Sequence, residues 1–180
     1  MKWVIASDIH GSAEACRKLL EHFKSEKADK LLLLGDLLYH GPRNDLPEKY
    51  GPKSVFEQLN EIKDKIVCVR GNCDAEVDQM VLEFPITADY VYLPLDDFHI
   101  FATHGHLYNL YSPPALEKGD VLLCGHTHIS ACEEANGFVY MNPGSTSIPK
   151  GGTPAGFMVY DAGTFTWKTL AGETYRTYKK

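Results

Sequence analysis

The chain has 180 residues, of which 44% are hydrophobic and 23% are charged, and its formal net charge is −6 at pH 7. This length is typical of one domain, so we expect a single domain over residues 1–180. The acidic balance argues against a long nucleic acid or an anionic membrane as partner, but it is compatible with a local phosphate site. The first ten residues do not resemble a signal peptide, and the five cysteines show no C-x-x-C spacing. We therefore expect a reduced, cytoplasmic protein.

Short apolar runs alternate with helical patterns in the first half of the chain, as a parallel α/β sheet requires. The first predicted helix begins after a cap at Ser12, and the second begins with a capping box of Ser54 and Glu57. Buried strands are predicted before, between and after these helices, at residues 3–7, 31–34 and 66–69.

The second half has a different pattern, with short strands that come in hairpins from about residue 90. Two more buried strands are predicted at residues 98–103 and 121–124. Turn signals lie at Asp96-Asp97, Asn136-Gly137 and Ala162-Gly163. The pattern predicts an α/β fold in which a parallel-rich sheet is completed by a mostly antiparallel one, with helices outside both.

Polar residues of metal-ligand type follow each of the five buried strands. In open α/β sheets, ligands bind beyond the carboxyl ends of the strands, so side chains far apart in sequence can converge there. A glycine accompanies each of these strand ends and lets the backbone turn sharply. The candidate ligands are Asp8, His10, Asp36, Asn72, His104, His126 and His128.

Two pairs of these residues are separated by one position, Asp8 with His10 and His126 with His128. In an extended segment such pairs point to the same side, roughly 6.6 Å apart at Cα, so each pair can face one site. Imidazole and carboxylate ligands suit manganese, iron, zinc or nickel better than magnesium or calcium. Taken singly, each motif also fits a helix cap or an ordinary turn, but five consecutive strand ends of this kind do not.

The same residues fall into ordered blocks that resemble the calcineurin-like metallophosphoesterase family. The blocks are Asp8-Ile9-His10, Gly35-Asp36, Gly71-Asn72-Cys73-Asp74, His104-Gly105 and Gly125-His126-Thr127-His128. Asn142-Pro143-Gly144-Ser145 is similar to the small bacterial phosphodiesterases of the family. The stretches 40–44, 71–80 and 147–152 resemble its YfcE-type subgroup.

This resemblance implies a four-layer αββα sandwich of two mixed β-sheets flanked by helices, with two divalent metal ions, manganese by preference, at the sheet edges. One ion would be held by Asp8, His10, Asp36 and His128. The other would be held by Asp36, Asn72, His104 and His126, so that Asp36 bridges both.

The resemblance also implies a phosphoric diester hydrolase that works by a two-metal mechanism with a bridging hydroxide. Two divalent ions, two carboxylates and one hydroxide leave a charge of about +1, which a diester balances more closely than a monoester does. Arg43, Asn44 and His40 are the candidate substrate-binding residues, with Arg70 as a further cation. Tyr39, Tyr108 and Tyr111 are candidates for stacking on an aromatic substrate group.

The resemblance places Asp36, Asn72, Cys73 and Asp74 in the catalytic set, Asp74 as the residue that orients the Asn72 loop. Cys73 stands where the family often has a histidine that protonates the leaving group. A thiol is a poor general acid, so we expect the best turnover on acidic leaving groups, unless His40 or His106 donates the proton.

Two other functions stay open at this point: a nucleotide phosphomonoesterase and a non-catalytic scaffold of the same fold. A nuclease is disfavoured because the chain lacks a Lys/Arg stripe. The expected partner is a small phosphodiester. Homo-oligomer formation through edge strands stays open as well.

Overall fold

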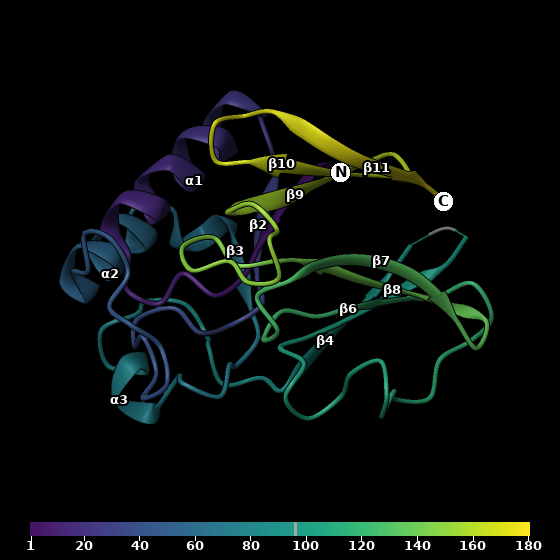
Figure 1. Cartoon of the computed structure of the whole chain (residues 1–180), viewed down its shortest axis with the longest axis horizontal. Coiled ribbons are helices and arrows are strands. Elements are labelled where there is room, and N and C mark those ends of the chain that lie inside the picture. Colours follow the sequence, from purple (N-terminus) through teal and green to yellow (C-terminus); the bar gives the residue numbers. More distant parts are fainter. Residues whose placement is uncertain (96) are drawn as a thin grey trace.

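Two β-sheets pack face to face in this computed structural model, which describes residues 1–95 and 97–180 (Figure 1). The six-stranded sheet has the order β11 (Thr174–Lys179), β10 (Thr164–Thr169), β9 (Gly156–Asp161), β1 (Trp3–Ala6), β2 (Lys30–Leu33) and β3 (Ile66–Cys68). The five-stranded sheet has the order β4 (Tyr90–Pro94), β5 (His99–Thr103), β6 (Val121–Leu123), β8 (Phe138–Pro143) and β7 (Ser130–Ala135).

Both sheets are mixed, which confirms the predicted fold class. In the first sheet β1, β2 and β3 are parallel, and β9 to β11 add an antiparallel half. In the second sheet β5, β6 and β8 are parallel, and β4 and β7 are antiparallel edges. The second sheet is therefore less antiparallel than expected. The parallel strands bring their carboxyl ends to one side of the sandwich, where the site lies.

The apolar core between the sheets is formed by side chains from both of them. Trp167, Met158 and Val121 are fully buried in it. The indole Nε1 of Trp167 donates to the carbonyl oxygen of Asn142 at 2.8 Å, so the largest core side chain also hydrogen-bonds across the two sheets. A satisfied donor of this kind removes the cost of burying the indole N–H.

Helices α1 (Ala13–Ser25) and α2 (Pro52–Asn60) cover the outer face of the six-stranded sheet, and α3 (Glu76–Gln79) lies beside them (Figure 1). As predicted, Ser12 caps α1: its hydroxyl accepts from the backbone N–H of Ala15 at 3.3 Å. The predicted capping box of α2 is wrong. The helix begins three residues earlier, with its cap at Gly51 and Pro52 in its first turn, so Ser54 lies inside it and accepts from Gln58.

The outer face of the five-stranded sheet differs from the expected helical layer. Phe101, Leu122 and Tyr140 on this face are covered by side chains of the loop between β5 and β6, such as Leu110 and Leu116. Within the described residues this loop contains no helix. Helices therefore flank one sheet, and a loop forms the fourth layer. No helix of the described chain could cross a membrane by its length and apolar character.

Two of the predicted hairpin turns are confirmed. Asn136-Gly137 joins β7 to β8 and Ala162-Gly163 joins β9 to β10, and all four residues have positive φ, as a two-residue type I′ turn requires. The third, Asp96-Asp97, includes residue 96, which lies outside the described residues. All five cysteines are free, and Cys16, Cys68 and Cys124 are buried.

Candidate active site

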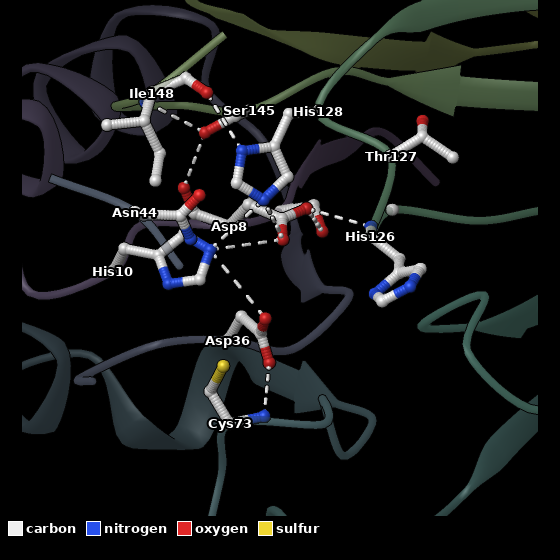
Figure 2. Close-up of polar contacts among 12 residues, drawn as sticks. Asp8, His10, Asp36, Asn44, Cys73, His126, Thr127, His128, Ser145 and Ile148 are labelled. Atoms are coloured by element: carbon white, nitrogen blue, oxygen red, sulfur yellow. Dashed lines mark hydrogen bonds and ion pairs between the residues drawn. The ribbon is translucent and has the colours of Figure 1, made fainter. Parts of the chain in front are cut away.

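The seven candidate ligands meet at the carboxyl ends of the parallel strands, beside the gap between the two sheets. Asp8 and His10 follow β1, Asp36 follows β2, and Asn72 follows β3. On the other sheet His104 follows β5, and His126 and His128 follow β6. Figure 2 shows Asp8, His10, Asp36 and His128 turned toward one another, whereas the side chain of Thr127 points away.

The first group of ligand atoms consists of Asp8 Oδ1, His10 Nε2, Asp36 Oδ2 and His128 Nε2. Asp8 Oδ1 lies 3.4 Å from His10 Nε2 and 3.2 Å from His128 Nε2. The two Nε2 atoms are 3.2 Å apart, and His10 Nε2 is 3.6 Å from Asp36 Oδ2. The ligand atoms of Asp8, His10 and His128 lie within 4.8 Å of one another, and Asp36 Oδ2 adjoins them on the side of His10.

The second group shares Asp36 Oδ2 with the first. His104 Nε2 lies 3.4 Å from this oxygen, 3.0 Å from Asn72 Oδ1 and 3.2 Å from His126 Nδ1. His104 Nε2 therefore contacts one atom of each of the other three residues predicted to hold the second ion. Because Asp36 Oδ2 belongs to both groups, it is placed as a bridging ligand would be.

The imidazole tautomers show that these atoms face each other with lone pairs. The Nδ1 atoms of His10, His104 and His128 lie 2.6 to 2.8 Å from the backbone carbonyls of Tyr39, Leu34 and Ile148. A carbonyl only accepts, so each Nδ1 donates and each neutral ring presents an unprotonated Nε2 to the cluster. Lone pairs about 3 Å apart repel each other unless a cation lies between them. The ligand residues therefore fit divalent metal ions, which such lone pairs would bind.

The carboxylate of Asp8 gives a second indication. It is fully buried; its Oδ2 accepts from the Ser7 hydroxyl at 2.6 Å and from the backbone N–H of His126 at 3.0 Å. Its Oδ1 has no hydrogen-bond partner in the described part of the chain. Burial alone would raise the pKa of Asp8, but the neighbouring imidazoles lower it well below its ordinary value. Burial likewise would lower the pKa of His104, yet the carboxylates raise it to about 9. The site therefore attracts positive charge.

Residues 1–164 match the calcineurin-like phosphoesterase superfamily domain. The chain belongs to this superfamily. Phosphodiesterase YfcE of Escherichia coli strain K12 is 52% identical over 161 residues, which are 89% of this chain and 88% of that protein. The solved structure of the E. coli phosphoesterase Yfce has 47% identity and a TM-score of 0.97, with 99% of both chains covered. Phosphodiesterase MJ0936 of Methanocaldococcus jannaschii is 28% identical, over 83% of this chain and 89% of that protein.

These comparisons confirm the predicted family, fold and enzyme class: the chain is a phosphoesterase of the calcineurin-like superfamily, whose members use divalent metal ions. A more distant structural likeness, to Vacuolar Protein Sorting 29 of Cryptosporidium parvum, has a TM-score of 0.65 at 17% identity and shows the shared fold alone.

The backbone of this phosphoesterase differs from the predicted extended geometry at the ligands. Asp8, His10, Asp36, His126 and His128 all have φ between 48° and 66°, the left-handed region. This region is uncommon for residues other than glycine. The paired ligands thus face the cluster because the chain turns back on itself directly after β1 and β6, and not because the segments are extended.

Two of the predicted turn glycines act through close approach instead. A Cβ on Gly71 would lie 2.1 Å from Asp36 Oδ1, and a Cβ on Gly125 would lie 1.9 Å from the Ser7 hydroxyl. Neither glycine has a positive φ. A side chain at either position would therefore displace a carboxylate of the cluster or the serine that holds it.

Hydrogen bonds from buried residues position the ligands. Asp74 accepts from the backbone N–H groups of Asp36 at 2.8 Å, Leu37 at 2.9 Å and Gly71 at 2.8 Å. This places Asp74 as the residue that fixes the bridging ligand and the following loop, in agreement with its predicted orienting role. Burial raises the pKa of Asp74.

Asn142, near the end of β8, and the segment that follows it brace the turns that carry the ligands. Asn142 donates to the carbonyl oxygen of Gly125 at 2.7 Å, and the hydroxyls of Ser145 and Ser147 donate to the carbonyl oxygen of Asp8 at 2.8 and 3.1 Å. Asn142 and this segment therefore hydrogen-bond to the turns after both β1 and β6.

A small pocket of about 50 Å³ opens onto the ligands. Arg43 and Asn44, two of the three candidate substrate-binding residues, line it together with Cys73, and so does Lys150, which was not among the candidates. Lys150 donates to Asn44 Oδ1 at 3.2 Å. The backbone N–H of Lys150 donates to the carbonyl oxygen of His128, and this bond brings Lys150 next to the ligands.

Two other candidates lie elsewhere. His40 does not line the small pocket; its ring packs edge-on against Tyr39 and Tyr50 at 4.8 and 5.3 Å. Arg70 is bound to Asp89 at 2.7 Å, which neutralises it. The Cys73 thiol faces the pocket, and burial, together with the Asp36 carboxylate, raises its pKa to about 12.

Proposed function

We propose that this phosphoesterase is a metal-dependent phosphodiesterase that hydrolyses small phosphodiesters in the cytoplasm with two divalent ions, manganese by preference. The observation that carries the proposal is the convergence of two sets of ligand-type atoms on Asp36 Oδ2. The E. coli relative at 52% identity, named phosphodiesterase, supports the diester specificity.

We assign the ligands of the two ions according to the two groups of atoms described above. Asp8, His10, Asp36 and His128 would hold one ion, and Asp36, Asn72, His104 and His126 the other. When bound, the ions would lower the pKa of a water molecule and neutralise charge that develops on the phosphoryl oxygens. The carbonyls that accept from the Nδ1 atoms direct the Nε2 atoms of the neutral rings at the cluster.

The chain's own residues orient the substrate. Arg43 and Lys150 are the cations of the small pocket, and together with the Asn44 amide they face the place where phosphoryl oxygens would lie. The backbone N–H of Cys73 donates to Asp36 Oδ1 at 2.8 Å and leaves Oδ2 directed at the cluster. The Cys73 thiol, which keeps its proton at neutral pH, lies at the edge of the same pocket.

A phosphomonoesterase is the second candidate, and Lys150 is the observation that favours it. Arg43 and Lys150 together offer more positive charge than a diester needs, and a monoester near −2 would use it. A non-catalytic scaffold is disfavoured because all seven ligand positions are filled by metal-ligating residue types.

The test is a comparison of bis(4-nitrophenyl) phosphate with 4-nitrophenyl phosphate, using protein loaded in turn with manganese, zinc, iron or nickel. We expect faster turnover of the diester and the highest rate with manganese. His128→Ala should lose the activity, whereas His22→Ala should keep it, because His22 packs on Phe157 away from the cluster. Faster turnover of the monoester would favour the second candidate, and no turnover of either would favour the scaffold.

A further inference from the structure

A second depression, distinct from the small pocket, opens on the other side of the ligand cluster. It is a groove of about 400 Å³ between the loop 105–111 and the first residues of β7, with Tyr140 of β8 as its floor. His126 lines both this groove and the small pocket, so the groove begins at the cluster. We call it the β7 groove.

The β7 groove differs chemically from the small pocket. Its walls include the apolar side chains of Leu110, Ile129 and Ala131, and the side chain of Tyr111 stands at its edge, 93% exposed. Glu133 is the one charged side chain among the groove-lining residues, which all lie in the described chain, apart from the histidines at its cluster end. The cations Arg43 and Lys150 are confined to the small pocket.

We propose that the β7 groove binds the organic arm of the substrate, and that this arm is aromatic and carries no further negative charge. The inference rests on the proposed function and names the substrate class. A phosphoryl group held by the small pocket leaves its ester arm to extend past His126 into the groove. There an aromatic ring would cover Ile129 and stack on Tyr111, which is otherwise exposed to water.

The negative charge of Glu133 disfavours the binding of substrate arms that carry additional anionic groups. A chain of nucleotides would place its next phosphate near this carboxylate, where no lysine or arginine lines the groove. Like charges at such separations disfavour binding, so the groove selects a diester with a neutral arm over an oligonucleotide.

The test uses phosphonates as probes, because each has one arm and is not hydrolysed. Binding of phenylphosphonate and methylphosphonate to the metal-loaded protein is measured by calorimetry. We expect phenylphosphonate to bind about fivefold more tightly, an aromatic contact of ordinary strength. In Tyr111→Ala the advantage should fall to less than about twofold. Equal or unmeasurable affinities of the two probes for the wild-type protein would overturn the proposal.

Two adjacent residues of β7 provide a matched pair of variants that tests the effect of charge in the groove. Glu133 and Glu134 are adjacent, both exposed, and point to opposite faces of the strand, so Glu134 lines a different depression beside Lys118. Glu133→Lys should improve the binding of 4-carboxyphenylphosphonate relative to phenylphosphonate by about fivefold. Glu134→Lys should leave this ratio unchanged. The same change in both variants, or in neither, would refute the role of Glu133.

Failure of this inference is distinguishable from failure of the proposed function. Hydrolysis of bis(4-nitrophenyl) phosphate by the wild-type protein tests the proposed function alone. An enzyme that hydrolyses this diester but binds both phosphonates equally is a phosphodiesterase without an aromatic-arm site. A protein that does not hydrolyse it contradicts the proposed function and the groove's role together.

Discussion

Gly125→Ala should destabilise the protein because the added methyl group has no space. The new Cβ would lie 1.9 Å from Ser7 Oγ, 2.8 Å from Ser7 Cβ and 2.9 Å from Asp8 Oδ2. Ser7 is fully buried and donates to Asp8 Oδ2 at 2.6 Å, so it cannot move aside without breaking this bond. Overpacking costs about 1–3 kcal/mol and a lost hydrogen bond to a charged group about 1.5–3 kcal/mol.

We therefore expect Gly125→Ala to lower the free energy of unfolding by about 3 kcal/mol, which corresponds to a Tm decrease of about 10 °C at this chain length. Urea denaturation followed by circular dichroism measures it. Gly51→Ala is the matched control, because its Cβ would have no neighbour closer than 3.8 Å and its φ is −164°. It should change the stability by a few tenths of a kcal/mol (about 0.3).

A second substitution separates the clash from other effects of alanine at this turn. Ser7→Gly removes both atoms of Ser7 that the new methyl group would meet, so in the Gly125→Ala background it should cost less than it does alone. The coupling energy between the two sites should exceed about 1 kcal/mol. Strict additivity of the two substitutions, or equal stability of Gly125→Ala and Gly51→Ala, would refute the steric reasoning.

Three further outcomes are expected from other parts of the chain. Asp36→Ala should reduce bound metal below one ion per chain and lower diester turnover by at least about a hundredfold, since Asp36 Oδ2 belongs to both ligand groups; metal analysis showing unchanged content would contradict the shared-ligand assignment. Cys73→His should raise the kcat/KM for an alkyl ester relative to that for a 4-nitrophenyl ester, and an unchanged ratio would contradict a role for this position in leaving-group protonation. Asp120 is buried, which by itself raises its pKa, but bonds from the backbone N–H groups of Glu117 and His99 and from the His99 ring lower it overall. A pKa that is lower in the folded state than in the unfolded state stabilises the protein at pH values above the unfolded-state pKa of about 3.9. Asp120→Asn should therefore lower the free energy of unfolding by about 2 kcal/mol at pH 7, and this loss should shrink as the pH falls below about 4. A loss that does not depend on pH would show that the charge is not involved.

The ligand set could be predicted from the sequence because it depends on order and strand polarity alone. Each ligand follows a strand whose apolar run is evident, and parallel strands bring their carboxyl ends together whatever the details of packing. Arg43 and Asn44 were candidates through the resemblance of residues 40–44 to the YfcE-type subgroup, and both line the small pocket. Lys150 was not among the candidates, and its position depends on a backbone bond to His128 across 22 residues.

The left-handed conformation of the ligands could not be predicted, because no local pattern specifies it. Asp8 and His10 are held in this conformation by contacts from distant parts of the chain. The N–H groups of Asp8 and His10 donate to the carbonyls of Gly35 and Asp36, and Ser145 donates to the carbonyl of Asp8.

The strained turns connect the site with the stability of the whole fold. A residue other than glycine in the left-handed region costs on the order of 1 kcal/mol or more, so five such ligands together cost about as much as a small protein's net stability. The cost is offset where buried groups bond to these turns: the carboxylate of Asp74 at the turn after β2, the serines after β8 at the turn after β1, and the amide of Asn142 at the turn after β6. None of these bracing groups supplies an atom to the ligand groups. Two ligand carboxylates take part in the bracing as well, because Asp8 Oδ2 accepts from the backbone N–H of His126 and Asp36 Oδ1 from that of Cys73. Replacing either carboxylate would therefore loosen a turn as well as remove a ligand atom.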